Sequence, residues 1–363
     1  MRSICILLNN DCSYNLDGRF QDIIQTFSCN GYAFDEVRFL RRFDENKLKT
    51  TIENVKREYD NAVFLTSIRL YSTICTYFQD IYRCQPQGIG ENAAFVDGEK
   101  SAILLSEQNV GETVKNVCIP FLQKKYKAVF QQLVFRSIGA NQAHINGLIV
   151  KAKTIDEGKM RYEISRDCAE TVVRIFFEEN VSKKVVDCVT RIFADGLQES
   201  LYAMEDVPLE KQLVELLKLR GKKLSVVESF TGGGIAKKIT SISGASQVYF
   251  EGLNTYDERS KMKRLGVSEY TLRTFGAVSD NTAYEMAAGL IATGDCDVSI
   301  ATTGLAGPKS DRSMLPIGLC YIAVGTKEKV FVYRYKFDGD RETITKTAIQ
   351  YALFLAYKQV KNI

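Results

Sequence analysis

Residues 226–234 read VVESFTGGG, an apolar segment that runs into a serine, a threonine and three glycines. The apolar residues predict a buried strand, and the spacing of those that follow predicts a helix from about Gly233 to Ile239. A strand followed closely by a helix is the repeating unit of layered α/β domains. Ligands in open α/β sheets bind at the carboxyl ends of strands, which is where Ser229 would lie.

The glycine-rich turn after Ser229 has two interpretations. Its glycines let a ligand approach the backbone, and the start of the following helix offers N–H groups and a partial positive charge to an anion. A turn that only connects a strand to a helix is an equally good interpretation, because such turns are common in α/β folds.

Two later segments also place polar residues after predicted strands. Residues 253–267 read LNTYDERSKMKRLGV, so Tyr256 follows a strand and Lys261 lies on the next helix. Residues 302–308 read TTGLAGP and follow another apolar strand. If these strands neighbour the first one, Tyr256 and Lys261 lie near Ser229. Taken singly, Lys261 is expected to be a solvated helix residue, since most lysines are exposed.

Two short segments near helix starts carry further candidates. Residues 275–279 read FGAVS, which predicts a turn with Ser279 as the N-cap of the following helix. Residues 338–341 read DGDR and open the last predicted helix. Arg341 could hold a phosphate in bidentate fashion or pair with the neighbouring acids.

Length and composition limit the classes of function. With 363 residues, of which 45% are apolar, the chain has enough material for more than one buried core. The formal charge of +4 comes from nearly balanced acidic and basic residues, so we expect no nucleic-acid partner. We find no signal peptide and no segment long enough to span a bilayer, so we expect a cytoplasmic protein without a membrane partner.

The histidine and cysteine counts exclude several mechanisms. The only histidine, His144, is far in sequence from Ser229, which disfavours a serine-histidine-acid triad. One histidine also excludes a zinc site built on two or three. The ten cysteines include no CxxC pair, so we expect reduced thiols. We therefore predict neither a metal nor a cofactor, and acid–base chemistry from lysine, carboxylate, tyrosine or cysteine.

The predicted elements divide the chain into three parts. Residues 1–128 alternate strands and helices, with a hairpin turned at Asp97-Gly98, and predict an α/β domain. Residues 129–204 predict a small α+β module. Residues 205–363 alternate again and predict a helix-flanked, mostly parallel sheet that ends in a hairpin. In this last part, strands are predicted at 223–228, 248–255, 297–303, 318–324 and 329–337, and helices at 209–220, 233–239, 258–265, 280–293 and 341–360.

The motifs of the last part resemble the C-terminal domain of the CinA family. ESFTGG, TYDERSKMKRLGV, GAVS and TGLAGP, then PIGL and a late GDR, occur in this order from about Leu209 to the end. Members of that family are nicotinamide-nucleotide amidohydrolases. The resemblance implies that nicotinamide mononucleotide is the substrate and that it is hydrolysed to nicotinic acid mononucleotide and ammonia. It also implies Ser229 as nucleophile and Lys261 as its partner, with Tyr256 and Thr303 in the pocket.

A serine–lysine mechanism agrees with the histidine count. A desolvated lysine with a lowered pKa can deprotonate a serine hydroxyl. We expect Ser229 to attack the carboxamide carbon, Lys261 to carry the proton to ammonia, and backbone N–H groups of residues 231–233 to hold the oxyanion. The candidate catalytic residues are Ser229, Lys261 and Tyr256. The candidate substrate-binding residues are Thr231, Gly232, Gly233, Thr303, Gly304, Gly307 and Arg341.

Two positions depart from the family pattern. Phe230 stands where the family usually has cysteine, and it could crowd the pocket. Residues 309–315 read KSDRSML where the family usually has two glycines and a threonine. Lys309 and Arg312 could bind phosphate, or this loop could obstruct the site. The alternative function is therefore a non-catalytic nucleotide-binding or interaction protein.

The first two parts resemble the rest of CinA proteins more faintly. Residues 1–128 are similar in layout to molybdenum-cofactor-biosynthesis-like domains, which implies three α/β/α layers with a mixed sheet. Family members that cleave ADP-ribose there carry a GGLGPT-like loop, whereas residues 67–80 read SIRLYSTICTYFQD, so we expect a structural role. ADP-ribose pyrophosphatase activity is the alternative. Residues 129–204 resemble a KH-like insert without a GxxG loop. The resemblance also implies a homodimer or higher homo-oligomer.

Overall fold

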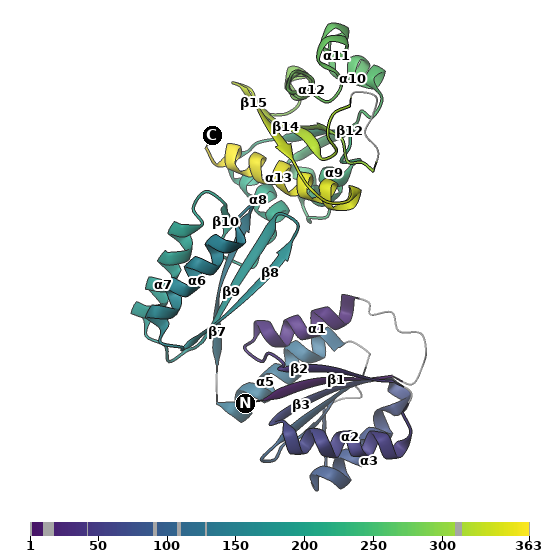
Figure 1. Cartoon of the computed structure of the whole chain (residues 1–363), viewed down its shortest axis with the longest axis vertical. Coiled ribbons are helices and arrows are strands. Elements are labelled where there is room, and N and C mark those ends of the chain that lie inside the picture. Colours follow the sequence, from purple (N-terminus) through teal and green to yellow (C-terminus); the bar gives the residue numbers. More distant parts are fainter. Residues whose placement is uncertain are drawn as a thin grey trace. The chain divides into compact units, whose positions relative to one another are not determined.

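The structure, a computed structural model, describes residues 2–9, 18–41, 43–89, 93–106, 110–127, 129–308 and 314–362 (Figure 1). The chain divides into two compact units. The first comprises Met1–Gln132, Asp156–Tyr162 and Arg174–Val186, and the second comprises Leu133–Ile155, Glu163–Val173 and Asp187–Ile363. The predicted domain boundaries at residues 128 and 204 stay predictions.

The first unit contains a six-stranded sheet in the order β2-β1-β3-β6-β5-β4. The strands β2, β1, β3 and β6 are parallel, and β5 and β4 continue the sheet in antiparallel pairs. Alternate residues of β1 enter two buried clusters, Ile4 and Ile6 on one face and Cys5 and Leu7 on the other. Helices complete both clusters, so the three-layer α/β/α arrangement is confirmed. The strands are β1 (Ser3–Asn9), β2 (Glu36–Arg41), β3 (Asn61–Thr66), β4 (Gln87–Ile89), β5 (Ala93–Val96) and β6 (Ser101–Ser106).

The helices of this unit include one that the sequence did not predict. Helix α3 occupies residues 68–82, where Ile74, Tyr77 and Phe78 are buried on one face at helical spacing. The hairpin predicted at Asp97-Gly98 is confirmed, because β5 and β6 pair antiparallel on either side of it. The helices are α1 (Gly18–Cys29), α2 (Glu45–Glu58), α3 (Ile68–Tyr82), α4 (Val110–Thr113), a π-helical turn (Val114–Cys118) and α5 (Ile119–Tyr126).

The middle of the chain forms a four-stranded sheet in the order β10-β7-β9-β8. This agrees with the α+β module predicted for residues 129–204. The elements are β7 (Phe130–Ile138), α6 (Gln142–Asp156), β8 (Met160–Asp167), β9 (Glu170–Glu178), α7 (Lys183–Gly196) and β10 (Leu201–Ala203).

The second unit contains a five-stranded sheet in the order β12-β11-β13-β14-β15. The strands β12, β11 and β13 are parallel, and β14 and β15 follow as antiparallel neighbours. This confirms the predicted sheet with a hairpin at its end. The strands are β11 (Leu224–Glu228), β12 (Tyr249–Asn254), β13 (Val298–Gly304), β14 (Leu319–Thr326) and β15 (Val330–Lys336).

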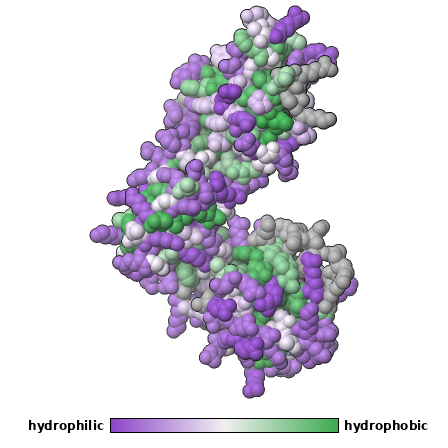
Figure 2. All heavy atoms as spheres, viewed as in Figure 1, coloured by the Kyte–Doolittle hydropathy of each residue, from purple (hydrophilic) through white to green (hydrophobic). Residues whose placement is uncertain are grey.

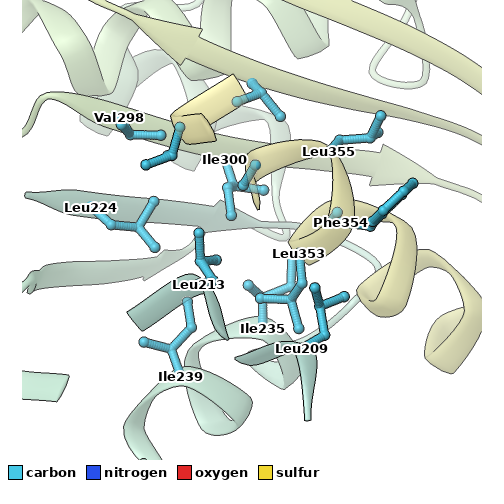
Figure 3. Close-up of a cluster of buried hydrophobic side chains, with 14 of the residues drawn as sticks. Leu209, Leu213, Leu224, Ile235, Ile239, Val298, Ile300, Leu353, Phe354 and Leu355 are labelled. Atoms are coloured by element: carbon cyan, nitrogen blue, oxygen red, sulfur yellow. The ribbon is translucent and has the colours of Figure 1, made fainter. Parts of the chain in front are cut away.

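Helices cover both faces of this five-stranded sheet. On one face, leucine and isoleucine side chains of α8, α9 and α13 pack against Leu224, Val298 and Ile300 (Figure 3). On the other face, Val227 and Ala301 join a cluster with residues of α12. The helices are α8 (Leu209–Arg220), α9 (Gly234–Thr240), α10 (Glu258–Leu265), α11 (Glu269–Phe275), α12 (Asp280–Ala292) and α13 (Arg341–Lys361).

The surface is polar over most of the face shown in Figure 2, with hydrophobic residues gathered in smaller patches. In the described ranges, no helix combines the length and apolar character needed to cross a membrane. The cysteines in these ranges are free thiols, of which Cys5, Cys118, Cys296 and Cys320 are buried.

Candidate active site

Three strand ends meet at one edge of the five-stranded sheet, which is the condition under which the sequence places Tyr256 and Lys261 near Ser229. Glu228, the last residue of β11, pairs with Asn254 of β12 and with Thr302 of β13. The next residues continue these pairings, because Ser229 N–H donates to the Thr302 carbonyl over 3.1 Å and Thr255 N–H donates to the Glu228 carbonyl over 2.9 Å. The turn that carries Ser229 therefore lies directly beside the segment that leads into α10.

Lys261 lies beneath this edge and contacts Ser229. Its helix, α10, begins after Asp257, whose carboxylate caps it by accepting from Arg259 N–H. The Lys261 side chain is only 1% exposed, and its Nζ lies 3.1 Å from Ser229 Oγ. Nζ also donates to the Thr255 carbonyl. The expectation that Lys261 is a solvated helix lysine is therefore wrong, because its helix starts at the strand ends and directs the side chain inward.

Burial changes the acid–base behaviour of this lysine. It lowers the pKa of Lys261 from 10.5 to about 8, and the carboxylates of Glu258 and Asp257 act more weakly in the opposite direction. The reason is that a buried ammonium loses hydration that a neutral amine does not need. At neutral pH an appreciable fraction of Lys261 is therefore neutral and able to accept a proton.

The start of helix α9 does not offer its N–H groups to a ligand. The carboxylate of Glu228 accepts from Gly233 N–H over 3.0 Å, from Ile235 N–H over 3.1 Å and from Ala236 N–H over 2.9 Å. The expected anion site at this helix start is therefore occupied by the chain's own charge. A glutamate at the end of a buried strand was the only signal in the sequence for this contact.

The same bonds restrict which backbone groups can hold an oxyanion. Gly233 N–H is bound to Glu228, and Gly232 N–H closes a turn onto the Ser229 carbonyl over 3.2 Å. Gly232 and Gly233 have φ angles of 62° and 93°, which favour glycine. Within the described chain, the N–H groups of Phe230 and Thr231 have no protein acceptor. Of the predicted oxyanion donors at 231–233, Thr231 is therefore the one whose N–H is not engaged.

The threonines of the site are bound to neighbouring backbone and side chains. Thr231 Oγ1 and Thr302 Oγ1 lie 2.7 Å apart, and both are buried. Thr303 donates its hydroxyl to the Ala277 carbonyl over 2.6 Å, which ties β13 to the turn before α12. At Gly304 a side chain would meet Cys320 Cβ at 2.5 Å, so this glycine permits the close approach of β14.

Arg341 connects two of the motif segments. Its Nη1 donates to the Gly307 carbonyl over 2.6 Å, and its Nη2 donates to the Tyr256 hydroxyl over 3.3 Å. Tyr256 is 66% exposed, so its ring stands at the surface of this edge. The described partners of Arg341 are neutral oxygens rather than the neighbouring acids. These contacts therefore do not neutralise the positive charge of the guanidinium.

Phe230 is accommodated by the core instead of crowding the strand ends. Its side chain is 5% exposed and joins a small cluster with Ala306, Cys320, Ile344 and Ala348. Beside the turn is an open hollow of about 570 Å³. It is lined by Phe230, Gly232, Arg341, Glu342, Thr345, Lys346 and Ile349.

Four further residues considered in the sequence analysis lie at other places in the chain. Ser279 caps α12 by accepting from Thr282 N–H, as predicted. His144 contacts the Gly196 carbonyl at 2.7 Å. Lys309 and Arg312 lie outside the described residues. The described residues include no cluster of three or more histidine, cysteine, aspartate or glutamate side chains that could hold a metal ion.

Sequence comparison relates the chain to known proteins. The family described as CinA C-terminal domain matches residues 206–360. A putative competence-damage inducible protein of Caldicellulosiruptor saccharolyticus is 36% identical over 246 residues, which are 67% of this chain and 60% of that protein. A CinA-like protein of Kosmotoga olearia is 32% identical over 240 residues, 65% of this chain and 58% of that protein.

A solved structure also matches part of the chain. The crystal structure of a CinA superfamily protein from Klebsiella pneumoniae is 27% identical with a TM-score of 0.42, and the match covers 43% of this chain and 97% of that one. The chain spans about 60% of the length of the curated relatives it matches. On the matched family domain and these relatives, the chain belongs to the CinA family.

Proposed function

We propose that the second unit hydrolyses nicotinamide mononucleotide to nicotinic acid mononucleotide and ammonia. One observation carries the proposal: a lysine that is 1% exposed places its Nζ 3.1 Å from the hydroxyl of Ser229 at the carboxyl edge of the sheet. Amide hydrolysis without histidine needs another base, and Lys261 has the burial and the lowered pKa that this role requires.

In this mechanism the neutral amine of Lys261 accepts the hydroxyl proton of Ser229 while Ser229 Oγ attacks the carboxamide carbon of the substrate. The Thr255 carbonyl, which accepts from Nζ, fixes the direction of the amine. The tetrahedral oxyanion is held by N–H groups of Phe230 and Thr231, and Lys261 then donates the proton to the departing ammonia. Water hydrolyses the acyl-enzyme, with Lys261 again as base.

Arg341 and Tyr256 are proposed to hold the substrate. The guanidinium is fixed by the Gly307 carbonyl and the Tyr256 hydroxyl, and it lines the hollow beside the glycine-rich turn. A guanidinium that is held in place binds a phosphate group with favourable geometry. A substrate whose phosphate is bound by Arg341 would have its carboxamide end free to reach Ser229.

The test is ammonia release from nicotinamide mononucleotide by the purified chain. We expect Ser229→Ala to lose roughly 10³-fold or more of the rate and Lys261→Ala about 10²- to 10⁴-fold. The matched controls are Lys263→Ala on the exposed face of α10 and Ser243→Ala on an exposed turn, which should keep the rate. A folded wild-type chain that releases no ammonia would contradict the proposed function, and an active Ser229→Ala variant would contradict the mechanism.

A further inference from the structure

Glu228 is a buried charge beside the nucleophile that the mechanism above does not use. It is 1% exposed and immediately precedes Ser229. No ion pair with a lysine or arginine is found for it among the described residues. A buried carboxylate without a cation is costly unless hydrogen bonds replace its hydration. Its position therefore needs an explanation.

Three backbone N–H groups supply that replacement. Oε2 accepts from Gly233 and Ile235, and Oε1 accepts from Ala236, at 2.9 to 3.1 Å. These donors belong to the last residue of the turn and the first turn of α9, whose dipole also favours a negative charge. The carboxylate consequently ties the end of β11 to the start of α9.

The segment between these two ends is the turn that carries Ser229. Its backbone is held further by Ser229 N–H on the Thr302 carbonyl and by Gly232 N–H on the Ser229 carbonyl. Since Glu228 engages Gly233, the turn leaves Phe230 and Thr231 as the residues whose N–H groups have no described protein acceptor. The Glu228 side chain thus fixes the last residue of the turn and engages its N–H group, while backbone carbonyls engage those of Ser229 and Gly232.

We propose that Glu228 is a positioning residue for the reaction: its carboxylate holds the 229–233 turn so that Ser229 Oγ stays within reach of Lys261 and the N–H groups of Phe230 and Thr231 stay available to the oxyanion. This role rests on the proposed deamidase function. Glu228 does not touch the substrate and transfers no proton.

The test compares the full-length chain with Glu228→Gln and Glu228→Asp. The glutamine amide would set an NH₂ group against one backbone N–H, and the aspartate is too short to reach all three. We expect kcat for ammonia release to fall about 10- to 100-fold in Glu228→Gln while KM changes little, because a small displacement of reacting groups has this effect. Glu228→Asp should also lose kcat. The control Glu215→Gln, on the exposed face of α8, should behave as wild type.

Two readouts separate positioning from a purely structural role. The midpoint of the pH–rate profile should stay where it is in wild type, since burial, Glu258 and Asp257 shift the pKa of Lys261 and Glu228 does not. Amide hydrogen exchange at Gly233, Ile235 and Ala236 should become faster in Glu228→Gln. A folded Glu228→Gln variant with wild-type kcat would overturn the proposal, as would a loss of activity fully explained by the unfolded fraction. A wild-type chain without ammonia release overturns the deamidase function itself and this role with it.

Discussion

Lys261 shows how the fold turns an ordinary surface residue type into a candidate base. The residue lies in the second turn of a short helix, where its neighbours Arg259 and Lys263 are exposed. It is buried because α10 begins directly after β12 and directs this one position under the strand ends. The Thr255 carbonyl and Ser229 Oγ satisfy its amine there.

The pH dependence of the reaction follows from this lysine. Because the neutral amine is the active form, kcat/KM should rise with pH and level off above about 8, the pKa of Lys261. The Glu258 carboxylate raises that pKa, so Glu258→Gln should lower it and move the midpoint of the profile to lower pH. Rates of ammonia release across pH 6 to 10 measure the shift. Glu269→Gln on the exposed first turn of α11 is the control, and an upward or absent shift in Glu258→Gln would contradict this role for Lys261.

Arg341 should act on substrate binding more than on the chemical step. A lysine at this position cannot donate to the Gly307 carbonyl and the Tyr256 hydroxyl in one plane. We expect Arg341→Lys to raise KM for nicotinamide mononucleotide by roughly 10-fold, with a smaller change in kcat. Steady-state kinetics of this variant and of Arg334→Lys, which is exposed on β15, provide the comparison. An unchanged KM would place the phosphate elsewhere.

At the level of elements, the position of α10 is set by its contact with α12. Gly289 lies in the middle of α12, and a Cβ there would stand 2.1 Å from the Leu265 carbonyl oxygen at the end of α10. Only a glycine lets the two helices approach this closely. The contact supports the helix that carries Lys261.

Two glycine-to-alanine substitutions in helices should therefore have opposite effects. Gly289→Ala should destabilise the protein by about 1–3 kcal/mol, because backbone atoms of α10 must move. Gly147→Ala in α6, where nothing lies within 4 Å, should stabilise by up to about 1 kcal/mol through helix propensity. Urea unfolding monitored by circular dichroism gives both values. If both substitutions changed the free energy of unfolding in the same direction, the backbone at the α10–α12 contact would be able to shift without cost.

Most elements of residues 205–363 were predictable because they combine an apolar face with a clear end signal. Gly221 ends α8 with positive φ, and Asp257 and Ser279 cap α10 and α12. Helix α3 was missed although its apolar residues have helical spacing, and α11 was missed because seven residues provide little pattern. The Ser229–Lys261 contact was expected from the family resemblance, whereas the residues alone predicted it only on the condition that the two strands are neighbours. The Glu228 cap did not, because its partners are backbone groups that no residue type encodes.

The second unit joins part of the middle sheet to the five-stranded sheet. Ile138, Ala169 and Tyr202 belong to the same buried cluster as α8 and α13. The side-chain amide of Gln350 on α13 accepts from Ala169 N–H and donates to the Asp167 carbonyl. The catalytic candidates all lie outside this contact.

A fragment of residues 205–363 should consequently keep ammonia release but lose stability. It retains Ser229 and Lys261, while α13 loses the apolar and amide partners it has in the intact chain. Thermal unfolding of this fragment, compared with a fragment of residues 129–363, should show a lower midpoint for the shorter one. Equal midpoints would show that the middle residues add nothing to this core, and loss of activity in a folded 205–363 fragment would implicate them in the site.

The packing of Phe230 has a consequence for substitution at this position. Its ring fills a space bounded by Ala306 and Ala348, whose small side chains make room for it, and by Cys320 and Ile344. A change to a smaller residue such as cysteine would empty that space unless several neighbours, distant in sequence, became larger at the same time. Position 230 can therefore change without loss of stability only together with the side chains that surround it.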